Sequence, residues 1–564
     1  MKFSEMPYTR PDLESFRAQA KETVEKLNNA ASVTEQLEAY RNYEKLSMHM
    51  ETMSTIAYIR HTINTKDAYY AAEQDWLDQV MPQVEEMQQQ VNLALLHSKF
   101  RKELAEELGE LLFTNLEIQV RSFQPDMINL LMEENKLSSD YQRLYASAMV
   151  EFDGQTMPLP KLGRYKQSTD RAVRKAAFEA EGRFFDEHQE ELDDIYDKMI
   201  KNRTAQAKLL GYDNYIQLGY DRLGRNCYGP KEVAAFREQI ARDMVPIVAK
   251  VKEDQRKRLG LDHMYFYDDL MLFADGNAVP QGTADDILKA GLDMYHGLSP
   301  ETNEFIDLMY DGELLDVLSK DGKAPGGYCS DLPDYKAPFI FSNFNGTSGD
   351  VDVLTHEAGH AFASYRAARN NIPRALQQPT MEACECHSMS MEFLTQDFHK
   401  NFFGDQTKKY ELYHCEDSLI FIPYGCMVDE FQHRMYETPE LTPAQRNEVW
   451  AELEKKYRPW LDFGDLPFYG RGAGWQRQLH IYQMPFYYID YCMAQTVAFQ
   501  FWMASLENRE DAWKRYLSFV DKGGSCTFEQ LVHGAGLKVP YEAGCIKEIG
   551  EKISKWIEGN QISF

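Results

Sequence analysis

Two histidines are spaced so that a single helix can direct both at one metal ion, and a glutamate directly follows the first of them. The stretch reads His356-Glu357-Ala-Gly-His360. Side chains at positions i and i+4 lie one turn apart on the same helix face, so both imidazoles can reach one ion at about 2.0–2.1 Å. Glu357 flanks the first histidine without being a ligand. We predict that it acts as a general base, which takes a proton from water during attack on a peptide carbonyl group and delivers it to the leaving amine.

The neighbouring residues predict the helix that this chemistry needs, over residues 350–369. Its apolar positions recur at helical spacing and are Val353, Leu354, Ala361, Phe362 and Tyr365. Ser348 or Asp350 can cap its start, and Pro373 lies beyond its end. Asp352 lies one turn before His356, where it can accept the second N–H of that histidine and fix its tautomer. A solvated carboxylate at the start of the helix is the alternative interpretation of Asp352.

A catalytic zinc site needs a third protein ligand and one open position. The next predicted helix begins near Thr380 and carries two glutamates, Glu382 and Glu385. They are three residues apart and can face the same side, so spacing alone does not choose between them. Cys386 and His387 are also chemically able to bind a metal. The pattern by itself leaves the third ligand open.

Strand signals are confined to the region before the predicted metal-binding helix. Residues 326–330 and 337–344 are short, rich in aromatic and β-branched residues, and bordered by glycine or proline. Pro338 has no N–H group, so its strand should lie at a sheet edge or begin there. An edge strand at this place would be a template for an extended peptide. An ordinary small sheet in a helical protein is the alternative.

The rest of the chain is predicted to be mainly helical. Residues 151–163 interrupt the helical pattern with glycines and prolines, which predicts a boundary between an amino-terminal helical lobe, 1–160, and a catalytic body, 161–564. The formal net charge of −28 argues against nucleic acid or an anionic membrane as a partner. Nine scattered cysteines and the lack of a long apolar segment predict reduced thiols and a cytoplasmic protein.

The motif and its surroundings resemble the thimet oligopeptidase and oligoendopeptidase F family of metallopeptidases. That family has a ligand glutamate at the start of an E-x-x-S-x-x-x-E run, which Glu385-Cys-His-Ser388-Met-Ser-Met-Glu392 matches and Glu382 does not. Similar segments occur at 203–212, at Gly326-Gly327-Tyr328 and at His480-Ile-Tyr482-Gln-Met-Pro-Phe-Tyr487-Tyr488. Within the family, the chain looks most similar to the bacterial oligoendopeptidase F-like branch that includes the Pz-peptidases. The resemblance covers most of the chain from about residue 170 onward.

The resemblance implies a two-lobed helical ellipsoid with a deep substrate channel, one Zn²⁺ held by His356, His360 and Glu385, and a small sheet beside the zinc helix. It also implies that His480 and a following tyrosine donate hydrogen bonds to the oxyanion, with Tyr487 favoured over Tyr488 and Tyr491. The predicted substrate contacts are Gly326, Gly327, Tyr328, Tyr482, Tyr488 and Tyr491. Packing in a helix core is the alternative for each of these aromatic residues after His480.

Together these features predict a zinc-dependent endopeptidase that hydrolyses short oligopeptides, either collagen-derived or general cytosolic peptides. Two other functions stay open at this level: a metal-stabilised peptide-binding protein without turnover, and an exopeptidase of the same zincin class. The intact Glu357 argues against the first, because a structural site gains nothing from a base and is usually closed by a fourth side chain.

Overall fold

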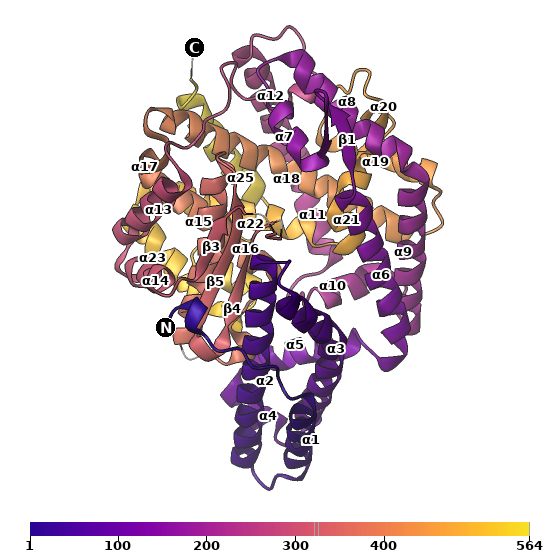
Figure 1. The fold of residues 1–564 in the computed structure, drawn as a ribbon, viewed down its shortest axis with the longest axis vertical. Helices are drawn as coiled ribbons and strands as arrows, with labels where there is room; N and C mark the ends of the chain where they lie inside the picture. The colour runs from indigo at the N-terminus through magenta and orange to yellow at the C-terminus, as the bar shows by residue number, and fades with distance from the viewer. Residues whose placement is uncertain (321, 325, 371, 563–564) are drawn as a thin grey trace. The chain divides into compact units, whose positions relative to one another are not determined.

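The protein is built almost entirely from helices. The computed structural model describes residues 1–320, 322–324, 326–370 and 372–562. Across these residues, strands form one two-stranded and one three-stranded sheet (Figure 1), so the expected mainly helical class is confirmed. None of the helices in the described part of the chain combines the length and apolar character that crossing a bilayer requires.

The chain forms two compact units, each assembled from segments far apart in sequence. The first unit contains Met1–Val120, Val279–Asp405 and Gln500–Leu537, and the second contains Arg121–Ala278, Gln406–Phe499 and Lys538–Phe564. This grouping differs from a single boundary between residues 160 and 161, because packing joins the amino-terminal helices to later segments. A grouping by contacts does not test where the lobes divide in sequence, so the predicted boundary stays a prediction.

The first unit contains the amino-terminal helices, the three-stranded sheet and the predicted metal-binding helix. Its elements are α1 (Leu13–Asn29), α2 (Val33–Ile63), α3 (Ala68–Leu96), α4 (Arg101–Leu108), α5 (Glu110–Arg121), α13 (Ala284–Leu298), α14 (Pro300–Asp311), β3 (Leu315–Leu318), β4 (Tyr328–Leu332), β5 (Ala337–Phe344), α15 (Gly349–Arg369), α16 (Met381–Leu394), α17 (Lys400–Phe403), α23 (Arg509–Val520) and α24 (Phe528–Gly534).

The second unit contains the hairpin and most of the remaining helices. Its elements are α6 (Ile128–Ala146), β1 (Met149–Phe152), β2 (Gln155–Pro158), α7 (Gly163–Lys166), α8 (Arg171–Glu187), α9 (Gln189–Leu209), α10 (Tyr215–Arg222), α11 (Pro230–Gln239), α12 (Val245–Arg258), α18 (Thr407–Glu437), α19 (Pro443–Tyr457), α20 (Pro467–Gly470), α21 (Leu479–Gln483) and α25 (Cys545–Gly559). Helix α22 (Tyr488–Glu507) begins in the second unit and ends in the first.

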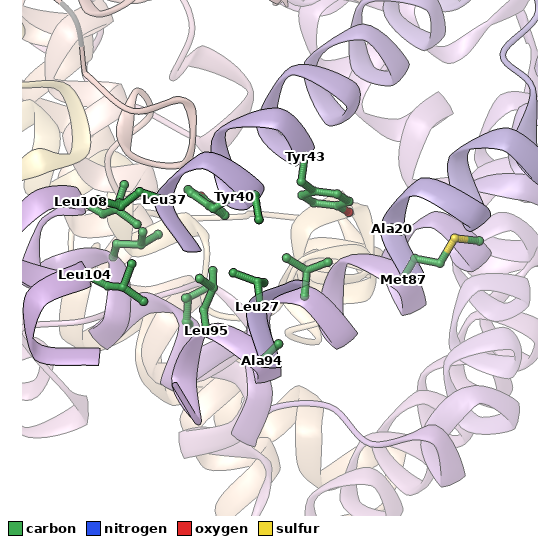
Figure 2. Close-up of a cluster of buried hydrophobic side chains, with 14 of the residues drawn as sticks. Ala20, Leu27, Leu37, Tyr40, Tyr43, Met87, Ala94, Leu95, Leu104 and Leu108 are labelled. Atoms are coloured by element: carbon green, nitrogen blue, oxygen red, sulfur yellow. The ribbon is translucent and has the colours of Figure 1, made fainter. Parts of the chain in front are cut away.

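The amino-terminal helices share a hydrophobic core of their own. Figure 2 shows labelled side chains from α1, α2, α3 and α4 pointing toward one another. Asp12 accepts the backbone N–H of Ser15 and Ser32 accepts that of Glu35, so the side chains before α1 and α2 cap both helices. Burial of the apolar faces then stabilises helices that would be marginal alone.

The three-stranded sheet lies directly before the predicted metal-binding helix. Its strand order is β3-β5-β4, with β5 parallel to β3 and antiparallel to β4. Strand β5 is therefore central, which corrects the expectation of an edge position. Pro338 is the second residue of β5, where the missing N–H group costs little. The other predicted possibility, that the proline lies where its strand begins, therefore agrees with the structure. The two edge strands are β3 and β4.

Helix α15 begins at Gly349, within one residue of its predicted start. Asp350 is buried, and its carboxylate accepts the backbone N–H of Asn345 at 2.8 Å and that of Gly346 at 2.7 Å. These bonds hold the tight connection from β5 into α15. The short link fixes the direction in which the helix leaves the sheet.

Helices α15 and α16 approach each other so closely that only glycine fits between them. A Cβ placed on Gly359 would lie 2.6 Å from Cα of Ser388 and 2.7 Å from the carbonyl oxygen of His387. These neighbours are backbone atoms and cannot rotate away. The third position after His356 therefore sets the distance between the two helices.

Replacing Gly359 with alanine should destabilise the protein by about 1–3 kcal/mol, because the added methyl group would overlap the backbone of α16. This cost opposes the intrinsic helix preference of alanine over glycine, about 1 kcal/mol. The measurement is the free energy of unfolding in denaturant. Gly163→Ala is the matched control, since a Cβ at Gly163 meets no atom within 4 Å. A Gly359→Ala variant as stable as the control would contradict this account of the helix spacing.

Candidate metal centre

His356, His360 and Glu385 converge on one point between α15 and α16. One potential ligand atom from each residue lies within 4.8 Å of the other two. Oε2 of Glu385 is 3.4 Å from Nε2 of His356 and 3.5 Å from Nε2 of His360. In a tetrahedral site with bonds of about 2.0–2.1 Å, neighbouring ligand atoms are about 3.4 Å apart. The spacing of these three atoms therefore fits a zinc-sized ion, and the group can bind a metal.

The surroundings of this group are rich in negative charge. Burial alone would raise the pKa of Glu385, but His360 and His356 lower it well below its usual value, so the carboxylate stays ionised. Burial favours the neutral form of His356, while Glu385 and Glu392 together raise its pKa well above the usual value. Carboxylates gathered around the two imidazoles favour positive charge at this point, either a proton or a metal ion.

Outer contacts hold the ligands in place. Oε1 of Glu392 lies 2.7 Å from Nδ1 of His356, which leaves Nε2 of the same ring directed toward Glu385. The hydroxyl of Ser388 lies 3.2 Å from Oε2 of Glu385. Glu392 and Ser388 stand seven and three residues after Glu385, on the same helix face, which is the signal that could have assigned them these roles. The corresponding role of Asp352 stays a prediction.

The other candidate ligands on α16 lie outside the metal group. Oε1 of Glu382 accepts a hydrogen bond from the hydroxyl of Thr380 at 2.5 Å. His387 is buried, its ring packs edge-on against Phe519, and burial lowers its pKa to about 3. Its ring is therefore neutral and faces the protein core. Glu385, and not Glu382, lies with the two histidines in the group that could hold a metal ion.

Glu357 is placed beside the metal group and next to the glycine-rich segment. Burial raises the pKa of its carboxyl group above the ordinary value, while the two histidines lower it by less. A Cβ built on Gly327 would lie 3.9 Å from Oε1 of Glu357. The predicted substrate-binding segment and the predicted base are therefore neighbours in the first unit.

Glycine has a conformational reason at position 326, whereas a Cβ at Gly327 would make only ordinary contacts. Gly326 has φ of +95°, which side chains rarely tolerate, and a Cβ on Gly327 would lie 3.4 Å from the carbonyl oxygen of Phe341. The ring of Tyr328 stacks on Phe341 at 4.7 Å, and its hydroxyl lies 2.6 Å from that of Thr62. The side chain of Tyr328 thus packs against α2, while its backbone continues along the edge strand.

The second unit gathers the predicted oxyanion residues into one aromatic cluster. The ring centroid of His480 lies 5.9 Å from that of Tyr487, 4.9 Å from that of Tyr488 and 6.0 Å from that of Tyr491. The three residues of the metal group belong to the first unit and this cluster to the second. The action of the cluster on a substrate at the metal therefore stays a prediction.

Tyr482 has a different environment from the other predicted contacts. Its side chain is fully buried, its ring stacks on Tyr141 at 4.0 Å, and its hydroxyl donates to the carbonyl oxygen of Leu192 at 3.4 Å. A side chain without exposed surface has no contact with a substrate in this conformation. The side chain of Tyr482 packs in the core in this conformation, and the substrate-binding role predicted for it stays a prediction.

The residue before Tyr487 is held in an unusual backbone conformation. Phe486 has φ of +68°, which costs energy for a side chain of this size. Its N–H donates to Oε1 of Gln432 at 3.0 Å, and its carbonyl oxygen accepts from Nη2 of Arg225 at 2.5 Å. Its ring lies over Gly219, where a Cβ would come within 2.6 Å. These contacts fix where the chain leads into Tyr487.

Sequence profiles of known families match most of the chain. Residues 3–123 match the Peptidase M3 N-terminal domain, and residues 164–277 and 295–551 match Peptidase family M3. The chain belongs to peptidase family M3. The family segment at 295–551 includes the three residues of the metal group and the cluster around His480.

Individual members of the M3 family are similar over much of their length. Oligopeptidase PepF of Bacillus subtilis is 25% identical over 70% of this chain, and the match spans 58% of that relative. An oligoendopeptidase F homolog of Borreliella burgdorferi is 24% identical over 70% of this chain and 68% of its own length.

Similar solved structures cover nearly the whole chain. A structure of Pz peptidase A with an inhibitor is 46% identical, with a TM-score of 0.93 over 99% of both chains. A putative oligoendopeptidase F from Bacillus anthracis is 42% identical, with a TM-score of 0.88 over 99% of this chain and 98% of its own. The predicted family resemblance is confirmed.

Glu392→Gln should weaken metal affinity by about 10–100-fold, because an amide orients the His356 ring less strongly than a carboxylate does. The measurement is competition for zinc against a chelator of known affinity. Asp352→Asn is the matched control, with the same change at the carboxylate one turn before His356. If Asp352→Asn lowers the affinity and Glu392→Gln leaves it unchanged, the orienting carboxylate is Asp352.

Proposed function

We propose that this M3 family member is a zinc-dependent endopeptidase that hydrolyses short oligopeptides. The observation that carries the proposal is the spacing of His356, His360 and Glu385 at tetrahedral distances, with Glu357 beside them. Three protein ligands leave one coordination position for a reactant, which is the arrangement of catalytic zinc sites. A purely structural site is usually closed by a fourth protein ligand.

Each residue of the centre has a separate task in this scheme. His356, His360 and Glu385 hold the ion, and Glu392 and Ser388 hold two of these ligands. Zinc in this position supplies Lewis-acid chemistry, which lowers the pKa of water and polarises a peptide carbonyl group. Glu357 takes the proton of the attacking water and passes it to the amine that leaves. Its place beside His356 and His360 supports this role.

The peptide is proposed to bind along β4. Strand β4 is at the end of the three-stranded sheet, so its outer side offers backbone groups to an extended peptide. Gly327, directly before β4, lies beside Glu357 and leaves room there because it has no side chain. A peptide paired to this edge would pass the base with its backbone rather than its side chains, which suits cleavage of many sequences.

The oxyanion that forms during attack is proposed to be stabilised by His480 and Tyr487. Both can donate a hydrogen bond, and their rings lie in one cluster. The backbone of Phe486 is strained and makes two hydrogen bonds, which supports a fixed position of Tyr487. The preference for short peptides is supported by the names of the relatives, which include an oligopeptidase and oligoendopeptidases.

Glu357→Gln should retain bound zinc and lose nearly all turnover, because an amide cannot take a proton from water. The substrate is a fluorescence-quenched peptide with both ends blocked, so that cleavage also separates endopeptidase from exopeptidase action. Zinc content is measured on the same samples.

Glu382→Gln is the control for this experiment, since Glu382 is a buried glutamate of α16 outside the metal group. Its activity should stay close to that of the unmodified protein. Activity of Glu357→Gln at the level of this control would defeat the proposed mechanism.

Tyr487→Phe should lower kcat by about 10²–10³, the usual effect of removing one oxyanion donor, with a smaller change in KM. Tyr488→Phe and Tyr491→Phe remove hydroxyl groups from the same cluster and serve as controls. The comparison needs kcat and KM for all three variants. If Tyr487→Phe is fully active and one of the others is impaired, that other tyrosine is the donor.

A further inference from the structure

A chain of hydrogen bonds leads from the imidazole of His480 through Gln478 to Tyr424. Nδ1 of His480 lies 2.9 Å from Nε2 of Gln478, and the hydroxyl of Tyr424 donates to Oε1 of Gln478 at 2.7 Å. Gln478 directly precedes α21, which carries His480, and Tyr424 comes from α18. All three residues belong to the second unit, so the chain is complete within one compact body.

The direction of these hydrogen bonds is set at the Tyr424 end. The hydroxyl of Tyr424 donates its proton to Oε1 of Gln478, and an amide oxygen can only accept. With its oxygen facing Tyr424, the amide of Gln478 turns its NH₂ group toward His480, and an NH₂ group only donates.

The consequence is a defined proton position on His480. A neutral imidazole has one donor nitrogen and one acceptor nitrogen, and the partner of one nitrogen decides the state of the other. Because Nδ1 accepts from Gln478, the ring proton lies on Nε2. We propose that Gln478 and Tyr424 are positioning residues that hold His480 in the tautomer protonated at Nε2.

The packing around the chain restricts other arrangements. Cζ of Arg458 lies 4.9 Å from the ring centroid of Tyr424, a cation–π contact. The ring of Tyr488 lies edge-on to Tyr424 at 5.9 Å and edge-on to His480 at 4.9 Å. Tyr488 therefore touches both ends of the hydrogen-bond chain, which limits rotation of either ring.

This inference rests on the proposed function, in which His480 donates a hydrogen bond to the oxyanion. A ring held in the Nε2–H tautomer is a donor in its neutral form and does not need a second proton. The donor is in place before the reaction begins, which is the condition for strong electrostatic stabilisation. In the opposite tautomer, Nε2 would be an acceptor and would repel the oxyanion.

Nuclear magnetic resonance of the full-length zinc-loaded protein tests this directly. Long-range ¹H–¹⁵N correlation spectra of protein labelled with ¹⁵N in its histidine rings distinguish a protonated from a bare ring nitrogen. The His480→Gln variant removes, and so assigns, the signals of His480. We expect a protonated Nε2 and a bare Nδ1. A His480 ring with its proton on Nδ1 would overturn the proposal.

Two variants then test whether Gln478 and Tyr424 set this state. In Gln478→Glu the new carboxylate can only accept, so a proton should appear on Nδ1. Tyr424→Phe removes the hydroxyl that orients the amide, and Nδ1 should become partly protonated. Gln483→Glu is the matched control, because the amide of Gln483 donates to the carbonyl oxygen of Ser138 at 3.3 Å and not to His480. Unchanged His480 signals in both variants would also overturn the proposal.

The ring signals are read on the resting protein, so this result is independent of peptide cleavage. If the proton lies on Nε2 and His480→Gln nevertheless has unchanged kcat, the tautomer assignment stands and the oxyanion role of His480 fails. If kcat of His480→Gln falls and the proton lies on Nδ1, the oxyanion role survives and the positioning by Gln478 and Tyr424 fails. If Gln478 had only a structural role, Gln478→Glu would change the free energy of unfolding without changing the Nδ1 signal of His480.

Discussion

The close approach of α15 and α16 at Gly359 is the constraint on which the metal centre depends. The backbone of His387 and Ser388 occupies the space that any larger residue at 359 would need. Glu385 lies almost one turn before Ser388 on α16, so this spacing places its carboxylate 3.4–3.5 Å from both histidine nitrogens. A wider separation of the helices would move the third ligand out of bonding range, because metal bonds tolerate deviations of only about 0.2 Å.

The carboxyl groups around His356 and His360 favour a bound cation. Glu385 is buried and stays ionised because the two histidines offset the cost of its burial. Glu392 lies behind His356, and Glu357 lies beside it with a raised pKa. Similar carboxyl groups thus have different properties within one small volume, since each has a different balance of burial and neighbouring charge. In the proposed mechanism, this separation allows Glu385 to bind the metal while Glu357 exchanges protons.

The second unit uses hydrogen-bond direction rather than charge to prepare its side chains. The hydroxyl of Tyr424 donates to Gln478, the amide of Gln478 donates to His480, and His480 lies at the end of that series. Phe486 is kept at positive φ by two hydrogen bonds and by its fit over Gly219. Strain of this kind persists only where the surroundings determine it from several sides. Gln478 and Phe486 both lie within a few residues of the aromatic cluster around His480.

Local spacing was enough to predict the metal-binding helix, the histidine pair and the position of Glu357, because a helix places residues i and i+4 on one face whatever surrounds it. The mainly helical class follows from similar periodicity. The third ligand was not decided by spacing, since Glu382 and Glu385 are equivalent on an isolated helix and only the family resemblance favoured one of them. The tertiary structure separates them, because α16 packs against α15 through Gly359 and turns Glu385 toward the histidines. The same holds for Glu392, for the core position of Tyr482 and for the central position of β5. Each depends on contacts between segments far apart in the chain, which periodicity within one segment cannot contain.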